Sequence, residues 1–412
     1  MKELNSWLAI DRDSDFSIYN LPFGVFSIHG GQRQIGMAIG DKIVNLTGLA
    51  DNELLPISSF FFRKDYLNDF IGLGKEVTKQ VRLEVQQLLS EENSPLRNHP
   101  DLLINQVEAA MHLPVKIGDY TDFYSSKEHA TNVGKMFRDP EHALLPNWKH
   151  IPVGYHGRAS SIRVSGEPFH RPMGQVLPDG SDEPVFQASA QVDFELEMGY
   201  IIGRESKLGD RINTTDAEDY IFGKVLFNDW SARDIQRWEY VPLGPFLSKS
   251  FASSMSPWVV TMEALEPFRV AGPIQEPKVL PYLAYSGDRN FDITLEVGLK
   301  AAHLDEQIFC RTNFKYMYWN MVQQLAHHTI NGCDVHIGDL MASGTISGST
   351  KGTYGSMLEL TWGGSQPIQM NDGTTRAFVE DMDIVTLRGY GVKKDIRVGF
   401  GSVSAQLLPC KE

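Results

Sequence analysis

Cysteine is scarce in this chain of 412 residues, which contains only Cys310, Cys333 and Cys410. No two of them form a CxxC pair, and an odd number leaves one over, so the sequence argues against a disulfide framework and a cysteine zinc site. Free thiols in a reducing compartment fit best. The chain also lacks an apolar run long enough to span a membrane. Its first residues, 1–4, do not join a basic region to an apolar run, so we expect no secretory signal and a cytoplasmic location.

Basic residues are fewer than acidic ones. Lysine and arginine number 38 against 52 aspartates and glutamates, which gives a formal net charge of -14. A nucleic-acid-binding protein would present a basic face, so we expect neither a nucleic acid nor a membrane as partner. The content of 42% hydrophobic and 22% charged residues is that of an ordinary globular protein, and the length allows two domains.

The first part of the chain has the pattern of a small domain with a helical linker, over residues 1–115. Two alternating apolar runs, 23–28 and 34–39, flank a glycine turn and predict a hairpin, with a third strand at 43–46. Apolar residues recur at helical spacing between Val77 and Leu89. The polar stretch that follows has no periodicity, and we interpret residues from 90 to about 115 as a linker.

Residues 116–412 predict a β-rich domain with few helices. Thr215 and Glu218 are spaced as a capping box for a helix over 215–222, and a second helix begins at Ser231. A third is expected over 313–330, before Asn331–Gly332. The strands expected here lie at 194–202, 224–228, 258–262, 293–299 and 357–362.

Acidic residues alternate with apolar ones at Asp193, Glu195 and Glu197. A strand would place all three on one face, about 6.5–7 Å apart, where they would meet either water or a cation. Asp229 ends a second apolar run, and Asp122 lies among aromatic residues, which favours a cation. Oxygen ligands without cysteine or paired histidine point to Ca²⁺ or Mg²⁺, and a set of four carboxylates is closer to a Ca²⁺ site.

A general base is less well marked by sequence. His129 lies seven residues after Asp122 and is either structural or catalytic. Glu359 has apolar neighbours that suggest burial, and a buried glutamate needs a partner, but sequence alone does not pair the two. His327–His328 falls inside a predicted helix, where adjacent side chains diverge, so a structural role is favoured. The chain has no GxSxG, HExxH, Walker A or helix-opening GxGxxG motif.

Several long, aromatic-rich strings carry a resemblance to a known family. They are Asp119–Ser126, Leu145–Trp148, Pro152–Arg158, Asn228–Gln236 and Gly344–Gly348. With them the chain resembles the fumarylacetoacetase (fumarylacetoacetate hydrolase) family. The likeness extends over nearly the whole chain and is densest from about residue 119 to residue 260.

The resemblance implies a β-rich α+β protein: an SH3-like N-terminal barrel, a large C-terminal mixed β-roll, and assembly as a homodimer. It implies Ca²⁺ bound by Asp122, Glu195, Glu197 and Asp229, while Asp193 is not a ligand in that family. A second cation, Mg²⁺, is expected near Asp229, Lys249 and Ser253. The family usually has Gly-Thr where this chain has Ala252–Ser253. Ser253 retains the hydroxyl, so we keep the site.

The chemistry implied is metal-dependent hydrolysis of the carbon–carbon bond of fumarylacetoacetate to fumarate and acetoacetate, the last step of tyrosine and phenylalanine breakdown. In this interpretation His129, oriented by Glu359, takes a proton from water. Donors to the oxyanion are expected to be Arg233, Gln236 and Lys249. The residues expected to contact the substrate are Tyr124, Arg138, Gln236, Tyr240 and Thr345.

Two alternatives stay open at this stage. Another reaction on the same fold, such as hydrolysis of a different acylpyruvate or 1,3-diketo acid, would use the same metal, because function resides in the site rather than in the fold. A non-catalytic, calcium-stabilised binding protein would need the carboxylates but not His129. The paired presence of His129 and Glu359, together with the N-terminal domain, favours the fumarylacetoacetate enzyme.

Overall fold

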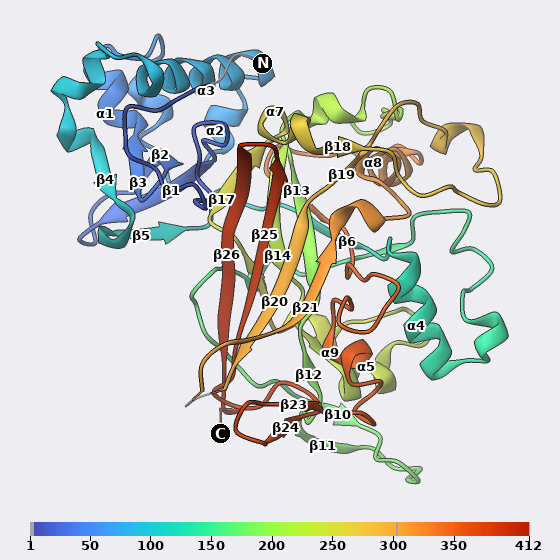
Figure 1. Ribbon diagram of the computed structural model, residues 1–412. Coiled ribbons are helices and arrows are strands. Elements are labelled where there is room, and N and C mark those ends of the chain that lie inside the picture. The colour runs from blue at the N-terminus through green and yellow to red at the C-terminus, as the bar shows by residue number, and fades with distance from the viewer. Residues whose placement is uncertain (1–3, 302–303, 412) are drawn as a thin grey trace.

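The computed structural model describes residues 4–301 and 304–411 and shows a mixed, strand-rich fold. Figure 1 shows the N-terminal strands and helices as a separate group beside the long strands of the rest of the chain. Within the described ranges, every helix is too short or too polar to cross a membrane. The cysteines are unpaired, with Cys310 buried, as the sequence predicts.

One large mixed sheet runs through the molecule, and Asp122, Glu195, Glu197 and Asp229 lie on its strands or next to their ends. Its main path follows the order β4-β3-β2-β1-β17-β14-β13-β22-β6-β7, with β5 added to β1 and β16 to β14. The strands are β1 (Phe23–Ile28), β2 (Gln34–Ile39), β3 (Lys42–Asn45), β4 (Leu103–Asn105), β5 (Ala109–His112), β6 (Tyr120–Phe123), β7 (Gly154–His156), β8 (Ile162–Val164), β13 (Leu196–Ile202), β14 (Ile221–Asn228), β16 (Ser253–Met255), β17 (Trp258–Thr261) and β22 (Leu340–Ala342).

A second sheet packs against the first and has the order β21-β20-β25-β26-β9. Its strands are β9 (Phe169–His170), β20 (Thr294–Lys300), β21 (Gln307–Asn313), β25 (Ile384–Lys393) and β26 (Ile396–Leu408). The long strands β25 and β26 lie beside β14 (Figure 1). Apolar residues of both sheets form one buried cluster that includes Leu226, Leu295 and Leu387. This packing closes one face of the large sheet.

The N-terminal strands continue the sheet of the larger part. β1 pairs with β17, placing Gly24 opposite Trp258. A Cβ atom on Gly24 would lie 2.5 Å from the Trp258 ring, so this close approach requires glycine. In the ranges that the structure describes, these strands form an open path rather than a closed barrel.

Most predicted elements are confirmed. The strands at 23–28 and 34–39 have the predicted bounds, and those at 43–46, 194–202, 224–228, 258–262 and 293–299 correspond to β3, β13, β14, β17 and β20. The helix at 77–89 is α3 (Lys75–Ser90), and the helix expected after Ser231 is α5 (Arg233–Glu239). The other helices are α1 (Leu46–Asp51), α2 (Asn68–Ile71), α4 (Lys127–Phe137), α6 (Leu247–Ser250), α7 (Met262–Leu265), α8 (Met321–Thr329) and α9 (Met357–Leu360).

Two predictions of element type are wrong. The segment 357–362 is not a strand, because Ser356 and Asp193 accept backbone N–H groups of residues 357–359 and start α9 there. The segment 215–222 is not an α-helix but a 3-10 helix at Ala217–Tyr220 followed at once by β14. Pairing of β14 with β13 overrides the local helix signal.

Two predictions of extent are also corrected. The helix expected over 313–330 is only α8, because a capping box of Asn320 and Gln323 starts it at Met321. Residues 90–115 are not an unstructured linker, since they contribute β4 and β5 to the large sheet. Short edge strands of three or four residues leave too little periodicity to be seen in sequence.

A fully buried lysine lies in the middle of β14. Lys224 is 1% exposed, and its ammonium lies 5.0 Å from the ring centre of Phe314 and 5.4 Å from that of Tyr200. Burial lowers the pKa of Lys224 to about 7, partly opposed by the charge of Glu218. The unfolded chain, with a usual pKa of 10.5, therefore binds more protons than the folded one above pH 7. Burial of Lys224 therefore lowers the free energy of unfolding at pH 7, and this loss disappears as the pH rises toward 10.

We predict that Lys224→Met raises the free energy of unfolding near pH 7.5 and that this advantage shrinks by about 1 kcal/mol per pH unit toward pH 9.5. Urea unfolding at the two pH values, followed by tryptophan fluorescence, measures it. The exposed strand lysine Lys300, changed to Met, is the control and should leave the pH dependence unaltered. An advantage of Lys224→Met that stays constant with pH would contradict the assignment.

Candidate active site

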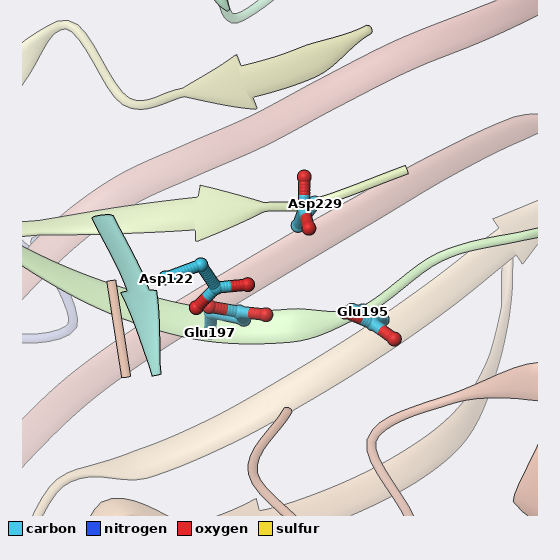
Figure 2. Close-up of side chains that lie close together, drawn as sticks. All are labelled: Asp122, Glu195, Glu197 and Asp229. Atoms are coloured by element: carbon cyan, nitrogen blue, oxygen red, sulfur yellow. The ribbon is translucent and has the colours of Figure 1, made fainter. Parts of the chain in front are cut away.

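Four carboxylates from separate segments meet at one edge of the large sheet. Asp122 lies on β6 and Glu197 on β13, Glu195 precedes β13, and Asp229 follows the end of β14. β22 pairs with both β6 and β13, and β13 pairs with β14, which brings these segments together. One oxygen of each carboxylate lies within 4.8 Å of the others, and Figure 2 shows Asp122 and Glu197 nearest each other, with Asp229 and Glu195 around them.

Burial makes this cluster electrostatically costly. Asp122, Glu197 and Asp229 are at most 2% exposed. Burial, and then the charge of Asp229, raises the pKa of Asp122 well above its usual range; burial and Asp122 do the same for Glu197. The N–H of Gly344 donates to both of these carboxylates at 3.0 Å, while Oε1 of Glu197 has no hydrogen-bond partner in the described part of the chain.

These features fit a hard divalent cation. The donors are all oxygen, and the unbonded Glu197 Oε1 belongs to the cluster that a cation would neutralise. Residues that the sequence placed far apart, at 122 and 229, thus join the two glutamates in one candidate site. Asp193, the third acid of the alternating run, is absent from the cluster.

Two cationic side chains balance the outer part of the cluster. Nζ of Lys249, on α6, lies 2.5 Å from Glu195 and 2.9 Å from Asp229, and Arg233 Nη2 lies 2.8 Å from Glu195. Burial alone would raise the pKa of Glu195, but the charges of Lys249 and Arg233 outweigh it and lower the pKa. Glu195 is therefore charged, whereas Asp122 and Glu197 are poised to release protons to a cation.

The surroundings of Asp229 bear on the predicted second cation. Ser253 donates to one oxygen of Asp229 at 3.0 Å, and the Tyr155 hydroxyl donates to the other at 2.5 Å. A charged ammonium has no lone pair for a metal. Lys249 could therefore serve a cation here only through its backbone carbonyl, not through Nζ.

A histidine–glutamate pair stands beside the carboxylates. His129 Nδ1 lies 2.6 Å from Glu359 Oε2, and both side chains are buried. His129 is in the first turn of α4, where its N–H donates to the Ser126 side chain. A carboxylate on Nδ1 favours the tautomer whose Nε2 is free to accept a proton. The structure thus pairs the two residues that sequence could not pair.

Three further side chains fix Glu359. Asn132 donates to Oε1 at 2.8 Å, and the hydroxyls of Ser347 and Ser356 donate to Oε2 at 2.8 Å each. Burial raises the pKa of Glu359, but the charge of His129 and these bonds outweigh it and lower the pKa. Glu359 is accordingly a charged, rigidly held acceptor.

The remaining predicted contacts lie at different depths. Arg233 Nη1 donates to Gln236 Oε1 at 3.0 Å, so these two residues of α5 meet as their spacing predicts. Thr345 is buried, and the Tyr124 ring centre lies 5.1 Å from that of His129. Tyr240 is 48% exposed.

Arg138 is exposed, and its Nε and Nη2 donate to the carbonyl of Ala143. Burial, and then the charges of Glu359 and Glu195, raise the pKa of Tyr124, and the charges of Arg233 and Arg138 partly oppose this. His327 and His328 do not join the site: they bond to Tyr282 and Thr121.

Sequence reasoning missed five residues of the site: Asn132, Tyr155, Asp193 in its actual role, Ser347 and Ser356. Asn132 gave a usable signal, because it follows His129 by three residues on one helix and so shares its face. Ser356 gave none, since the segment after it has the pattern of a strand.

Comparison with known proteins assigns the family. A model described as "Fumarylacetoacetate (FAA) hydrolase C-terminal" matches residues 119–407, and one described as "Fumarylacetoacetase N-terminal" matches residues 19–114. The chain belongs to the fumarylacetoacetate hydrolase family. "Fumarylacetoacetase" of Homo sapiens is 52% identical over 413 residues, covering 98% of this chain and 99% of the relative. That of Arabidopsis thaliana is 46% identical over 423 residues, covering 99% of each.

A solved structure agrees on the fold. "Fumarylacetoacetate hydrolase (EaFAH) from psychrophilic Exiguobacterium antarcticum" superposes with a TM-score of 0.54, covering 94% of this chain and 99% of that one. Its sequence identity is only 16%, so the likeness concerns the fold alone.

We predict that Asp122→Asn raises the melting temperature of chelator-treated protein, because it removes a buried carboxyl group whose ionisation is disfavoured in the folded state. The same substitution should remove most of the increase in melting temperature that Ca²⁺ produces. In the unmodified protein that increase should be larger at pH 8 than at pH 6, since the raised pKa of Asp122 and Glu197 means that Ca²⁺ must displace protons. Thermal unfolding followed by circular dichroism, with and without Ca²⁺, measures both.

The exposed Asp119, changed to Asn, is the matched control for Asp122→Asn and should behave like the unmodified protein. A full response of Asp122→Asn to Ca²⁺ would exclude Asp122 from the ligand set.

Proposed function

We propose that this protein is a fumarylacetoacetase: it hydrolyses the carbon–carbon bond of fumarylacetoacetate and releases fumarate and acetoacetate. The observation that carries the proposal is the His129–Glu359 pair, 2.6 Å apart, beside the buried carboxylate cluster. Relatives with that name match the chain over nearly its whole length. In metabolism the reaction would end tyrosine and phenylalanine breakdown.

The chemistry starts at His129. With Nδ1 bound to Glu359, Nε2 takes a proton from water, whose oxygen then bonds to the carbonyl carbon of the substrate. When bound, a divalent cation supplies Lewis-acid polarisation and orients the diketone. Breaking the carbon–carbon bond leaves its electron pair on the acetoacetate part, which then takes up a proton.

The oxyanion that forms during attack needs fixed donors. Arg233, Gln236 and Lys249 provide them, and Arg233 and Lys249 are already oriented by their ion pairs with Glu195. Donors that are held before the reaction need not reorganise as charge develops. The short helices α5 and α6 therefore supply the electrostatic part of catalysis.

Substrate contacts are assigned to Tyr124, Arg138, Gln236, Tyr240 and Thr345. A guanidinium can bond both oxygens of a carboxylate, which suits Arg138 to one end of a dicarboxylic substrate. The exposure of Arg138 and Tyr240 supports a place at the entrance, while buried Thr345 lies deeper.

For the cations, we propose Ca²⁺ on Asp122, Glu195, Glu197 and Asp229, because four carboxylates suit it better than Mg²⁺. A second cation, Mg²⁺, would lie near Asp229, with the hydroxyl of Ser253 and the backbone of Lys249. Metal analysis of protein purified without chelator tests both identities. The result that would contradict this assignment is stoichiometric binding of another metal.

Three broader features are proposed on the same basis: an SH3-like N-terminal unit over residues 1–115 beside a β-roll over 116–412, a homodimer, and a cytoplasmic location. Side chains of the segment 240–247 support association, since Leu243 is 96% and Phe246 70% exposed. Sedimentation equilibrium tests the dimer, and cell fractionation tests the location.

The alternatives are distinguished by the substrate used. Purified protein should consume fumarylacetoacetate, followed by loss of its ultraviolet absorbance, and lose this activity when chelated. Cleavage of other acylpyruvates with no turnover of fumarylacetoacetate would move the assignment to another hydrolase on this fold. Absence of turnover with both substrates, in cation-loaded protein, would favour a binding protein.

We predict that His129→Ala lowers kcat by about 10²–10⁴-fold, because no other group takes the proton from water. The absorbance assay measures kcat. The variant should retain the circular dichroism spectrum of the unmodified protein and its Ca²⁺ affinity, which calorimetry measures. His150 is exposed, and His150→Ala is the control expected to keep full activity. Normal turnover by folded His129→Ala would refute the mechanism.

A further inference from the structure

Asp193 is a buried acid for which the proposed mechanism has no use. It lies on β12 (Val192–Asp193), which pairs with β15 (Ser231–Ala232) immediately before Arg233. Its exposed fraction is 0%, so its charge must be balanced inside the protein. A solvated strand face, the simplest expectation for alternating acids, does not occur at this position.

Both oxygens of Asp193 are engaged, and they bind two different parts of the site. Oδ1 accepts the N–H of Met357 at 2.6 Å, and Oδ2 accepts the N–H of Leu358 at 3.0 Å. Oδ2 also accepts Nε of Arg233 at 2.8 Å. One carboxylate therefore joins the first turn of α9 to the first residue of α5.

Each of these helices carries one half of the candidate machinery. Glu359 on α9 holds His129, the base. Arg233 on α5 reaches Gln236 with Nη1 and Glu195 with Nη2, so it lies among the donors and beside the carboxylate cluster. The helix that holds the base through Glu359 and the helix that bears Arg233 are far apart in the chain, and Asp193 bonds directly to both.

We propose that Asp193 is a positioning residue that acts through Arg233. By holding the Nε edge of the guanidinium, it fixes the direction of the remaining N–H groups relative to His129. It also divides the positive charge of Arg233 between two carboxylates, so that Glu195 is not taken up by Arg233 alone and stays available to a cation. The kinetic part of this inference rests on the proposed hydrolysis, whereas the cation part does not.

Loss of the Asp193 charge has two consequences. The guanidinium turns toward Glu195, which moves the donors away from the reacting oxygen and lowers kcat. The tighter Arg233–Glu195 pair competes with a cation for Glu195, which weakens cation binding. Asp193→Asn keeps the size of the side chain and one oxygen for the N–H of Met357, but it loses the charge and the bonds that Oδ2 accepts from Arg233 and Leu358. The Arg233→Gln background separates the contribution of Arg233 from that of α9.

If Asp193 had a purely structural role, in which it only starts α9, the expected result of its substitution would be different. It would change stability, and its effect would be independent of Arg233. The chain offers a matched control for this role: Asp383 is 1% exposed, pairs with Arg376 at 2.9 Å, and accepts the N–H of Glu380 at 3.0 Å. Asp383→Asn should lower the melting temperature but leave kcat and cation binding unchanged.

A double-mutant cycle tests the inference with Asp193→Asn, Arg233→Gln and the double variant of the full chain. Asp193→Asn is expected to lower kcat about 10–100-fold, with KM for fumarylacetoacetate changed less than about 3-fold. Its dissociation constant for Ca²⁺, measured by calorimetry, should rise about 10-fold. In the Arg233→Gln background the same substitution should change either quantity by less than about 3-fold.

The proposal is overturned if folded Asp193→Asn keeps both kcat and Ca²⁺ affinity, or if its losses multiply fully with those of Arg233→Gln. Should Asp193→Asn not fold, Asp193→Ser removes the carboxylate without adding volume, and the same outcomes apply to it. If the unmodified protein does not turn over fumarylacetoacetate, the proposed function fails, yet the Ca²⁺ cycle still decides the role of Asp193.

Discussion

Repulsion among buried carboxylates is the constraint around which the site is organised. Asp122, Glu195, Glu197 and Asp229 lie within 4.8 Å of one another at a depth where water cannot screen them. Isolated charges in such a place would cost more than an ordinary domain's stability allows. Lys249 and Arg233 offset part of the cost, Gly344 and Tyr155 offer hydrogen bonds, and the remaining deficit is what a cation would supply.

The same constraint explains why short, irregular elements surround the cluster. Lys249 and Arg233 have to approach Glu195 from different directions, and α6 and α5 deliver them as helices of four and seven residues. Glu359 likewise stands on a single turn, started by Ser356 and Asp193. The carboxylates lie on regular strands or directly beside a strand end. The groups that balance or orient them come from short segments whose geometry is determined by tertiary contacts.

This division also separates what sequence could predict from what it could not. Strands such as β1 and β2 were predicted to the residue, because two short apolar runs flank a glycine turn. Nearly every residue of both strands is buried, so their apolar content, rather than one buried face, marks them in the sequence. The cluster of four carboxylates was predicted from acids next to apolar runs and from the resemblance to the family. The pairing of His129 with Glu359 spans 230 residues of sequence, and no local pattern encodes it.

The two predictions of element type were wrong for the same physical reason. Met357–Leu360 has the apolar content of a strand, yet the carboxylate of Asp193, far away in sequence, captures its N–H groups and turns it into α9. Ile221 and Phe222 were assigned to a helix from local spacing, whereas they belong to β14, which pairs with β13. In both segments, a residue or strand that is not adjacent in sequence determines the backbone conformation.

The bond between β1 and β17 has a consequence for any attempt to isolate the catalytic part. Because the N-terminal strands extend the same sheet that carries Glu197, cutting the chain near residue 115 would remove β1 from one side of β17 and leave only β14 on the other. A row of open N–H and C=O groups, flanked by the newly uncovered ring of Trp258, would then face solvent. The N-terminal part thus protects an edge of the sheet from pairing with other chains. We expect a fragment without it to aggregate.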